Sequence, residues 1–99
     1  MIIKKVDNPG RLLGLEETKQ VKSGLVVLKP GENVGLHITE KREEVIVILE
    51  GNAMVEDEKE RQNVTVGQII YIPPETKHNV TNIGDNNLRY IYIVNLYEN

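Results

Sequence analysis

The sequence predicts an all-β fold, a small antiparallel sandwich or barrel, and three observations lead to that prediction. The apolar residues come in short runs rich in valine, isoleucine and tyrosine. Glycine, proline, asparagine and clusters of charged residues separate these runs. No segment of helical length keeps the i, i+3, i+4 spacing of an amphipathic helix. Short apolar runs at regular spacing, punctuated by turn residues, are typical of sandwiches and barrels.

The strands are expected wherever β-branched and aromatic residues gather between turn signals. These stretches are residues 2–6, 18–28, 34–39, 44–50, 53–56, 63–66, 69–72, 78–81 and 88–97. The turn signals between them are residues 29–31, 50–52, 57–60, 73–74 and 84–87, which are rich in proline, glycine, asparagine and charged residues. Residues 8–17 leave room for one short turn of helix. The tyrosines on the strands are expected to pack against their neighbours.

Composition limits what the protein does. The chain has 99 residues, which fits one domain over residues 1–99. Its formal net charge of −3 is spread along the chain without a basic stripe, so we expect no nucleic-acid partner. With no cysteine, a disulfide and a thiolate metal site are both excluded.

The apolar runs also bear on where the protein works. None is longer than five residues, so we expect no membrane span. The N-terminal residues lack the apolar run of a signal peptide, and a cytoplasmic location is therefore expected.

Two of the expected strands are apolar on both faces. Every residue from Val45 to Leu49 is apolar, and Ile91 and Ile93 lie opposite the main apolar face of residues 88–97. Because successive side chains point to opposite sides of a strand, the outer face of both strands needs cover. A second copy of the chain would supply it in a homodimer, which we expect for a chain this small. The alternative is that the N-terminal segment folds back over the same surface.

Three residues stand out as candidates for chemistry. His37 and His78 are the only histidines in the sequence, and each falls in an expected strand. Glu44 shares its strand face with two isoleucines, so its carboxylate should be buried and should need a cation or hydrogen-bond donors. Two imidazoles and one carboxylate suit a first-row divalent metal ion such as Fe, Mn, Ni or Zn.

The spacing of these residues resembles the two motifs of the cupin superfamily. The first motif corresponds to Gly31, five residues, His37-Ile38-Thr39, four residues, Glu44, six residues and Gly51. The second corresponds to Gly67, five residues, Pro73-Pro74-Glu75, two residues, His78, three residues and Asn82. The resemblance covers about half of the chain. It implies an antiparallel cupin barrel of the jelly-roll or double-stranded β-helix type.

The resemblance also implies that His37, Glu44 and His78 are three of the four metal ligands of the family. The spacing to Gly51 selects Glu44 rather than Glu43. Thr39 stands where the family has its second histidine, and a threonine hydroxyl is a poor ligand that could still hold a water molecule. We therefore expect the replacement of Thr39 by histidine to tighten metal binding. The alternative is that the three residues bind one another or a ligand without a metal ion.

Two other positions of the second motif call for comment. Glu75 replaces a glycine of the motif, so this turn is expected to use a different backbone conformation. Asn82 is either a partner of the site or a residue that holds a turn.

Two functions are consistent with this pattern. The first is a metal-dependent enzyme that acts on a small polar organic molecule, as an isomerase, dioxygenase or decarboxylase does. The second is a module that binds or senses a small, sugar-like ligand or a metal ion without turnover. The barrel type hosts many unrelated functions, so the fold alone does not decide between them.

Overall fold

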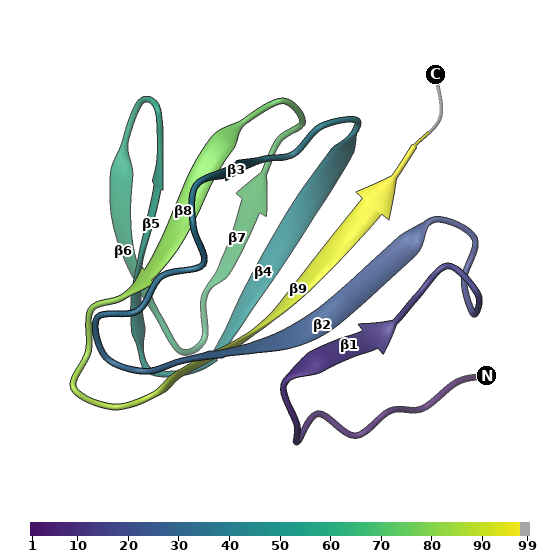
Figure 1. The fold of residues 1–99 in the computed structure, drawn as a ribbon, viewed down its shortest axis with the longest axis horizontal. Coiled ribbons are helices and arrows are strands. Elements are labelled where there is room, and N and C mark those ends of the chain that lie inside the picture. Colours follow the sequence, from purple (N-terminus) through teal and green to yellow (C-terminus); the bar gives the residue numbers. More distant parts are fainter. Residues whose placement is uncertain (98–99) are drawn as a thin grey trace.

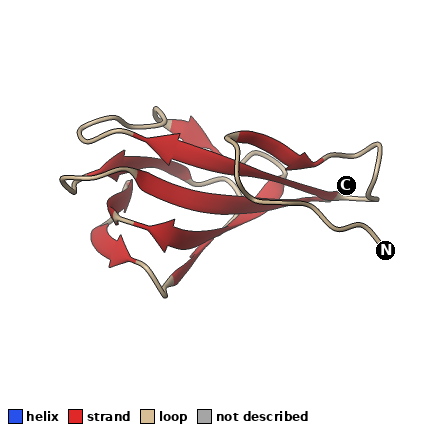
Figure 2. Cartoon of the chain, turned by 90° about the horizontal axis from the view of Figure 1, so that it is seen from below, coloured by secondary structure: helices blue, strands red, loops and turns tan. Residues whose placement is uncertain are grey.

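A computed structural model describes residues 1–97, and their regular structure is entirely β-strand, as predicted (Figure 1). Figure 2 shows only strands and loops along this part of the chain. The strands are β1 (Gly10–Leu13), β2 (Val21–Leu28), β3 (His37–Ile38), β4 (Arg42–Glu50), β5 (Asn52–Asp57), β6 (Arg61–Thr65), β7 (Ile69–Ile72), β8 (Lys77–Asn82) and β9 (Leu88–Leu96). Within residues 1–97 there is no helix of the length and hydropathy that a membrane crossing requires.

The strands form two antiparallel sheets that enclose the core. One sheet has the order β1-β2-β9-β4-β7, and the other has the order β3-β8-β5-β6. From β4 onward the chain crosses repeatedly between the sheets, so residues far apart in the sequence meet inside the barrel. In Figure 1 the second sheet stands on the left, and the strands of the first fan out to the right.

Side-chain alternation decides which residues reach the interior. β4 buries every second residue from Glu44 to Ile48, and β8 does the same from His78 to Asn82. Since β4 and β8 belong to opposite sheets, their inward faces look at each other across the barrel. The buried apolar cluster consists of Leu28, Ile46, Ile48, Ala53, Val55, Ile72, Val80, Leu88 and Tyr90.

Gly51 makes the tight turn between β4 and β5. Its φ is 93°, a left-handed conformation that favours glycine. A Cβ atom here would lie 2.7 Å from the backbone oxygen of Asn87. The last glycine of the first motif is thus required both by the turn and by the close approach of the chain before β9.

The N-terminal part of the chain differs from the prediction. Residues 2–6 form no strand, and Ile3 is 85% exposed. The first strand is β1, which lies within residues 8–17, where the sequence leaves room for a helical turn, and Gly10 pairs with Leu25. The strand expected at residues 34–39 shrinks to β3, because Gly35 has a φ of 93° and interrupts the extended backbone.

The outer face of the five-stranded sheet is covered only in part. At the β2 side Leu25 is 2% exposed, and the Arg89 Nη2 atom donates a hydrogen bond to the Val6 oxygen at 3.2 Å. At the β7 edge Ile69 and Tyr71 remain 70% and 56% exposed. The N-terminal segment therefore approaches this face at β9 and leaves the β7 edge open.

Candidate metal centre

The two histidines lie side by side on the second sheet. His37 of β3 pairs directly with His78 of β8, and opposite residues of an antiparallel pair point to the same side. Their ring centroids are 4.1 Å apart. His78 is completely buried, whereas His37 is exposed at the rim of the barrel. The pair therefore extends from the interior of the barrel to its mouth.

Glu44 reaches the histidines from the opposite sheet. Its Oε1 atom lies 3.0 Å from the Nε2 atom of His78, and the residue is 8% exposed. Its neighbour Glu43 points outward, where its two carboxylate oxygens accept hydrogen bonds from the Tyr71 hydroxyl and the Asn95 amide. Between the two adjacent glutamates, only Glu44 faces the histidines.

Backbone carbonyls orient both imidazoles. The Nδ1 atom of His37 lies 2.9 Å from the Gly35 oxygen, and the Nδ1 atom of His78 lies 2.9 Å from the Thr76 oxygen. Because a carbonyl oxygen only accepts hydrogen bonds, each Nδ1 carries a proton. The Nε2 atom of each ring is thus the nitrogen left to bind a metal ion.

The three side chains are close enough to approach one ion. One ligand atom from each of His37, Glu44 and His78 lies within 4.8 Å of the others. A Zn²⁺ ion with bonds of about 2.0–2.2 Å holds its ligand atoms no more than about 4.4 Å apart. Shifts of a few tenths of an ångström would therefore bring the three donors to one ion, so the donor set fits a divalent metal in chemistry and in spacing.

Without a metal ion, His78 and Glu44 form a buried hydrogen-bonded pair. Burial of His78 opposes its charged form, but the hydrogen bonds to Glu44 and to the Thr76 carbonyl outweigh it and raise the pKa of His78 above its ordinary value. The Nε2 proton between the two side chains occupies the position that a metal ion would take. Metal binding here therefore competes with protonation of His78.

Thr39 has a different role from the histidine that the motif leads one to expect. It is 2% exposed, and its Oγ1 atom donates to the Pro73 oxygen at 2.7 Å and accepts from the Thr76 nitrogen at 3.0 Å. The hydroxyl is thus used in fixing the loop before β8. The carbonyl of Thr76 in turn orients His78, so Thr39 acts on the site indirectly, by holding the residue that positions this imidazole.

The remaining motif positions are structural. The Asn82 amide donates to the Leu28 and Asn86 oxygens, and its Oδ1 atom accepts from the Gly84 nitrogen, so this residue holds a turn. Glu75 has a φ of 57°, so it takes the left-handed conformation that glycine favours, and the expected change of backbone conformation is not seen.

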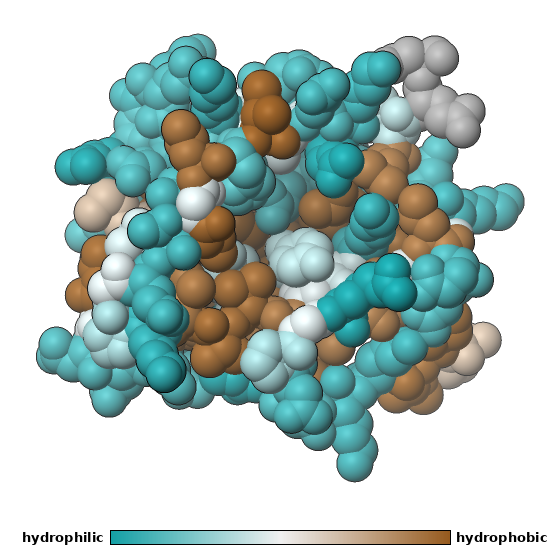
Figure 3. All heavy atoms as spheres, in the orientation of Figure 1, coloured by the Kyte–Doolittle hydropathy of each residue, from teal (hydrophilic) through white to brown (hydrophobic). Residues whose placement is uncertain are grey.

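A cavity of about 250 Å³ opens above the histidine and glutamate cluster. It is lined by Val26, Val34, His37, Ile38, Thr39, Arg42, Glu44, Tyr90, Tyr92 and Val94. Burial raises the pKa of the Tyr90 hydroxyl, and the nearby Glu44 adds to this effect, so the phenol stays protonated. In Figure 3, which has the orientation of Figure 1, brown apolar side chains gather in the middle of the face among teal polar ones.

Arg42 was not singled out from the sequence as a site residue. The available signal was its position two residues before Glu44, which places both side chains on one face of β4.

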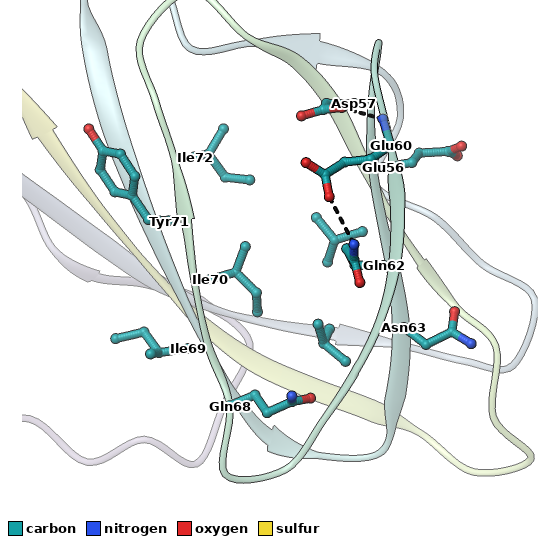
Figure 4. Close-up of a pocket in the computed structure, with 12 residues that line it drawn as sticks. Glu56, Asp57, Glu60, Gln62, Asn63, Gln68, Ile69, Ile70, Tyr71 and Ile72 are labelled. Atoms are coloured by element: carbon teal, nitrogen blue, oxygen red, sulfur yellow. Dashed lines mark hydrogen bonds between the residues drawn. The ribbon is translucent and has the colours of Figure 1, made fainter.

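A second groove of about 340 Å³ lies between β7 and the β5–β6 hairpin (Figure 4). Its carboxylates are occupied with local contacts. Asp57 accepts from the Lys59 and Glu60 nitrogens, and Glu60 accepts from the Gln62 amide. Among residues 1–97, the cluster of His37, Glu44 and His78 is the one group with metal-ligand geometry. The groove is therefore the weaker candidate for a site.

Comparison with known proteins identifies the family. The model of the Cupin_2 family, described as a cupin domain, matches residues 24–94, which is most of the chain. This chain is a cupin.

Two curated proteins match the cupin in sequence. An uncharacterised protein, MJ1618 of Methanocaldococcus jannaschii, is 38% identical over 69 residues, which are 68% of this chain and 55% of that protein. The polyketide synthase CurC of Streptomyces cyaneus is 29% identical over 69 residues, which are 70% of this chain and 45% of that protein. The cupin thus spans about half the length of the curated relatives it matches.

A solved structure supports the fold independently. A predicted oxalate decarboxylase of Thermotoga maritima superposes with a TM-score of 0.87 and covers 97% of this cupin and 100% of its own chain. Its sequence identity is 20%, so the likeness concerns the fold alone.

Proposed function

We propose that this cupin binds one divalent metal ion through His37, Glu44 and His78 and acts on a small polar organic molecule that enters the cavity above them. The convergence of the three donors from opposite sheets supports the proposal most strongly. When bound, such a metal ion supplies a Lewis acid that polarises a carbonyl or hydroxyl oxygen. The reaction would be of the isomerase, dioxygenase or decarboxylase type. The similar Thermotoga maritima structure is that of a predicted oxalate decarboxylase.

The residues of the proposed metal site have different roles. Backbone carbonyls fix the two imidazoles through their Nδ1 atoms, so the ligand nitrogens are oriented before a metal ion arrives. The buried position of Glu44 keeps its carboxylate away from solvent. Exposure of His37 at the rim leaves the outer side of the cluster open to a small molecule.

A non-catalytic role in binding or sensing a small ligand or a metal ion is the second candidate. One observation favours it. The hydroxyl of Thr39 is engaged with the loop at residues 73–76, so this position adds no fourth ligand to the cluster. Three protein ligands hold an ion less tightly than four and leave more room for exchange.

Metal analysis distinguishes the two candidates. The 99-residue protein is purified without added metal, dialysed against metal-free buffer and measured by elemental analysis for Fe, Mn, Ni and Zn. The enzyme proposal predicts about one ion per chain that survives dialysis. Substoichiometric metal that dialyses away favours the binding module, and the absence of metal binding even after Zn²⁺ is added contradicts the metal centre.

We also propose that the cupin forms a homodimer through the outer face of β4, β7 and β9. Register places Tyr71, Val45 and Ile93 in one row across these strands, and Tyr71 and Ile93 are 56% and 38% exposed. Exposed apolar surface of this kind marks an interaction site.

Sedimentation velocity at micromolar concentration measures the oligomeric state. We expect a dimer for the parent, a monomer for Ile69→Lys at the β7 edge, and a dimer for the control Ile83→Lys in the loop after β8. A monomeric parent protein contradicts the proposal.

A further inference from the structure

The cavity has one arginine in walls that are mostly apolar. Val26, Val34, Ile38 and Val94 supply apolar surface, while Arg42 is the one lysine or arginine among the lining residues. The carboxylate of Glu44 lies deeper, next to the completely buried His78. The cavity therefore brings together a guanidinium, apolar side chains and two of the candidate metal ligands, His37 and Glu44.

Arg42 is held toward the cavity by its strand position and by a backbone contact. It precedes Glu44 by two residues on β4, so the two side chains share the inward face. Its Nε atom donates a hydrogen bond to the backbone carbonyl oxygen of Glu40 at 3.2 Å, which fixes the near end of the guanidinium. The two terminal nitrogens are left for another acceptor. No carboxylate of residues 1–97 forms an ion pair with Arg42. An arginine that lines a cavity without an ion-pair partner is suited to a planar anion with two oxygens.

Two phenols add hydrogen-bond donors to the same space. Tyr90 and Tyr92 of β9 both line the cavity. Neither hydroxyl has a hydrogen-bond partner among residues 1–97, and neither oxygen is completely closed off, since no fully buried side-chain polar atom in this part of the chain lacks a partner. Gly24 of β2 makes room for one of them, since a Cβ there would lie 2.6 Å from the Tyr92 hydroxyl. A phenol donates one hydrogen bond, which a carboxylate oxygen accepts readily.

We infer that Arg42, Tyr90 and Tyr92 form the binding site for one carboxylate of a small organic acid. The guanidinium supplies a positive charge and N–H donors that match the two carboxylate oxygens, and the phenols supply neutral donors. The apolar side chains pack against the short carbon skeleton of the acid. The inference deepens the proposed function by naming the substrate class, and it rests on that function only for the metal ion beside the carboxylate site.

Lactate and its neutral isostere lactamide test the inference. Isothermal titration calorimetry measures both probes against the Zn²⁺-loaded protein and against protein stripped with a chelator. We expect lactate to bind about ten- to hundredfold more tightly than lactamide, because hydrogen bonds to a charged group are the stronger ones. Arg42→Gln should abolish this preference, Arg42→Lys should retain part of it, and the control Arg61→Gln on the exposed hairpin should leave it unchanged.

The measurements separate this inference from the metal centre. Zn²⁺ affinity, measured by chelator competition, should be the same in Arg42→Gln as in the parent protein, since Arg42 belongs to the carboxylate site only. A lactate preference that depends on Arg42 in protein that binds no Zn²⁺ supports the inference while the proposed metal function fails. Equal binding of the two probes, undetectable binding of lactate, or a preference that survives in Arg42→Gln overturns the inference.

Discussion

Replacing Glu44 with glutamine should lower the affinity of the protein for Zn²⁺ by about a hundredfold or more. Even the loss of a group that only supports a metal ligand costs about 10–100-fold in affinity, and this change removes the only carboxylate of the cluster. Glutamine keeps the size of the side chain, so the barrel should remain folded. Competition against a chelator gives the affinity, and circular dichroism checks the fold.

The neighbouring glutamate is a matched control. Glu43→Gln makes the same chemical change one residue away, but Glu43 faces outward and contacts Tyr71 and Asn95. Its Zn²⁺ affinity should equal that of the parent protein. If the two variants bind Zn²⁺ equally well, the metal centre proposed for this cluster is wrong.

The pH dependence of the same titration gives a second signature. Zn²⁺ must displace the Nε2 proton of His78, whose pKa is raised in the metal-free protein by the hydrogen bond to Glu44 despite burial. Above that pKa the proton is already absent, so affinity should level off. Below it, affinity should fall by about tenfold for each pH unit. In Glu44→Gln, His78 is still buried but no longer has a carboxylate beside it, so its pKa should be lower than in the parent protein. The fall in Zn²⁺ affinity should therefore begin at a lower pH.

The parts of the site that the sequence predicts correctly follow from short-range rules. Side-chain alternation along β4 is a local property, and it distinguishes Glu44 from Glu43 without any knowledge of the partners of either residue. The apolar runs placed most of the strands for the same reason. Residues 2–6 have the composition of a strand but form none, because a strand also needs a partner, and no other strand pairs with them.

The parts that the sequence does not reveal depend on long-range contacts. The hydroxyl of Thr39 meets the loop at Pro73, which lies 34 residues further along the chain. No pattern around Thr39 indicates that partner, so the motif suggested only a missing ligand. The same is true of Arg42, because the cavity that it lines also needs Tyr90 and Tyr92 of β9, which are far from it in the sequence.

Thr39→Val should destabilise the protein by about 1–3 kcal/mol and should also weaken Zn²⁺ binding. Valine has nearly the shape of threonine but leaves the Pro73 oxygen and the Thr76 nitrogen without their partner, and an unsatisfied buried polar group costs about that much. Because the Thr76 carbonyl orients His78, a loosened loop should reduce Zn²⁺ affinity by about tenfold. Urea unfolding measures the first effect, and chelator competition measures the second.

Variants at the same position separate the hydroxyl from the other features of Thr39. Thr39→Ser keeps the hydroxyl and should preserve Zn²⁺ affinity, with a smaller loss of stability from the missing methyl group. Thr39→His, expected from the motif alone to tighten metal binding, should now weaken it. The imidazole must enter a position that is 2% exposed and must break both hydrogen bonds of the hydroxyl before it reaches an ion. Tighter Zn²⁺ binding by Thr39→His, or equal stability of the valine and serine variants, would show that the hydroxyl does not hold the loop that positions His78.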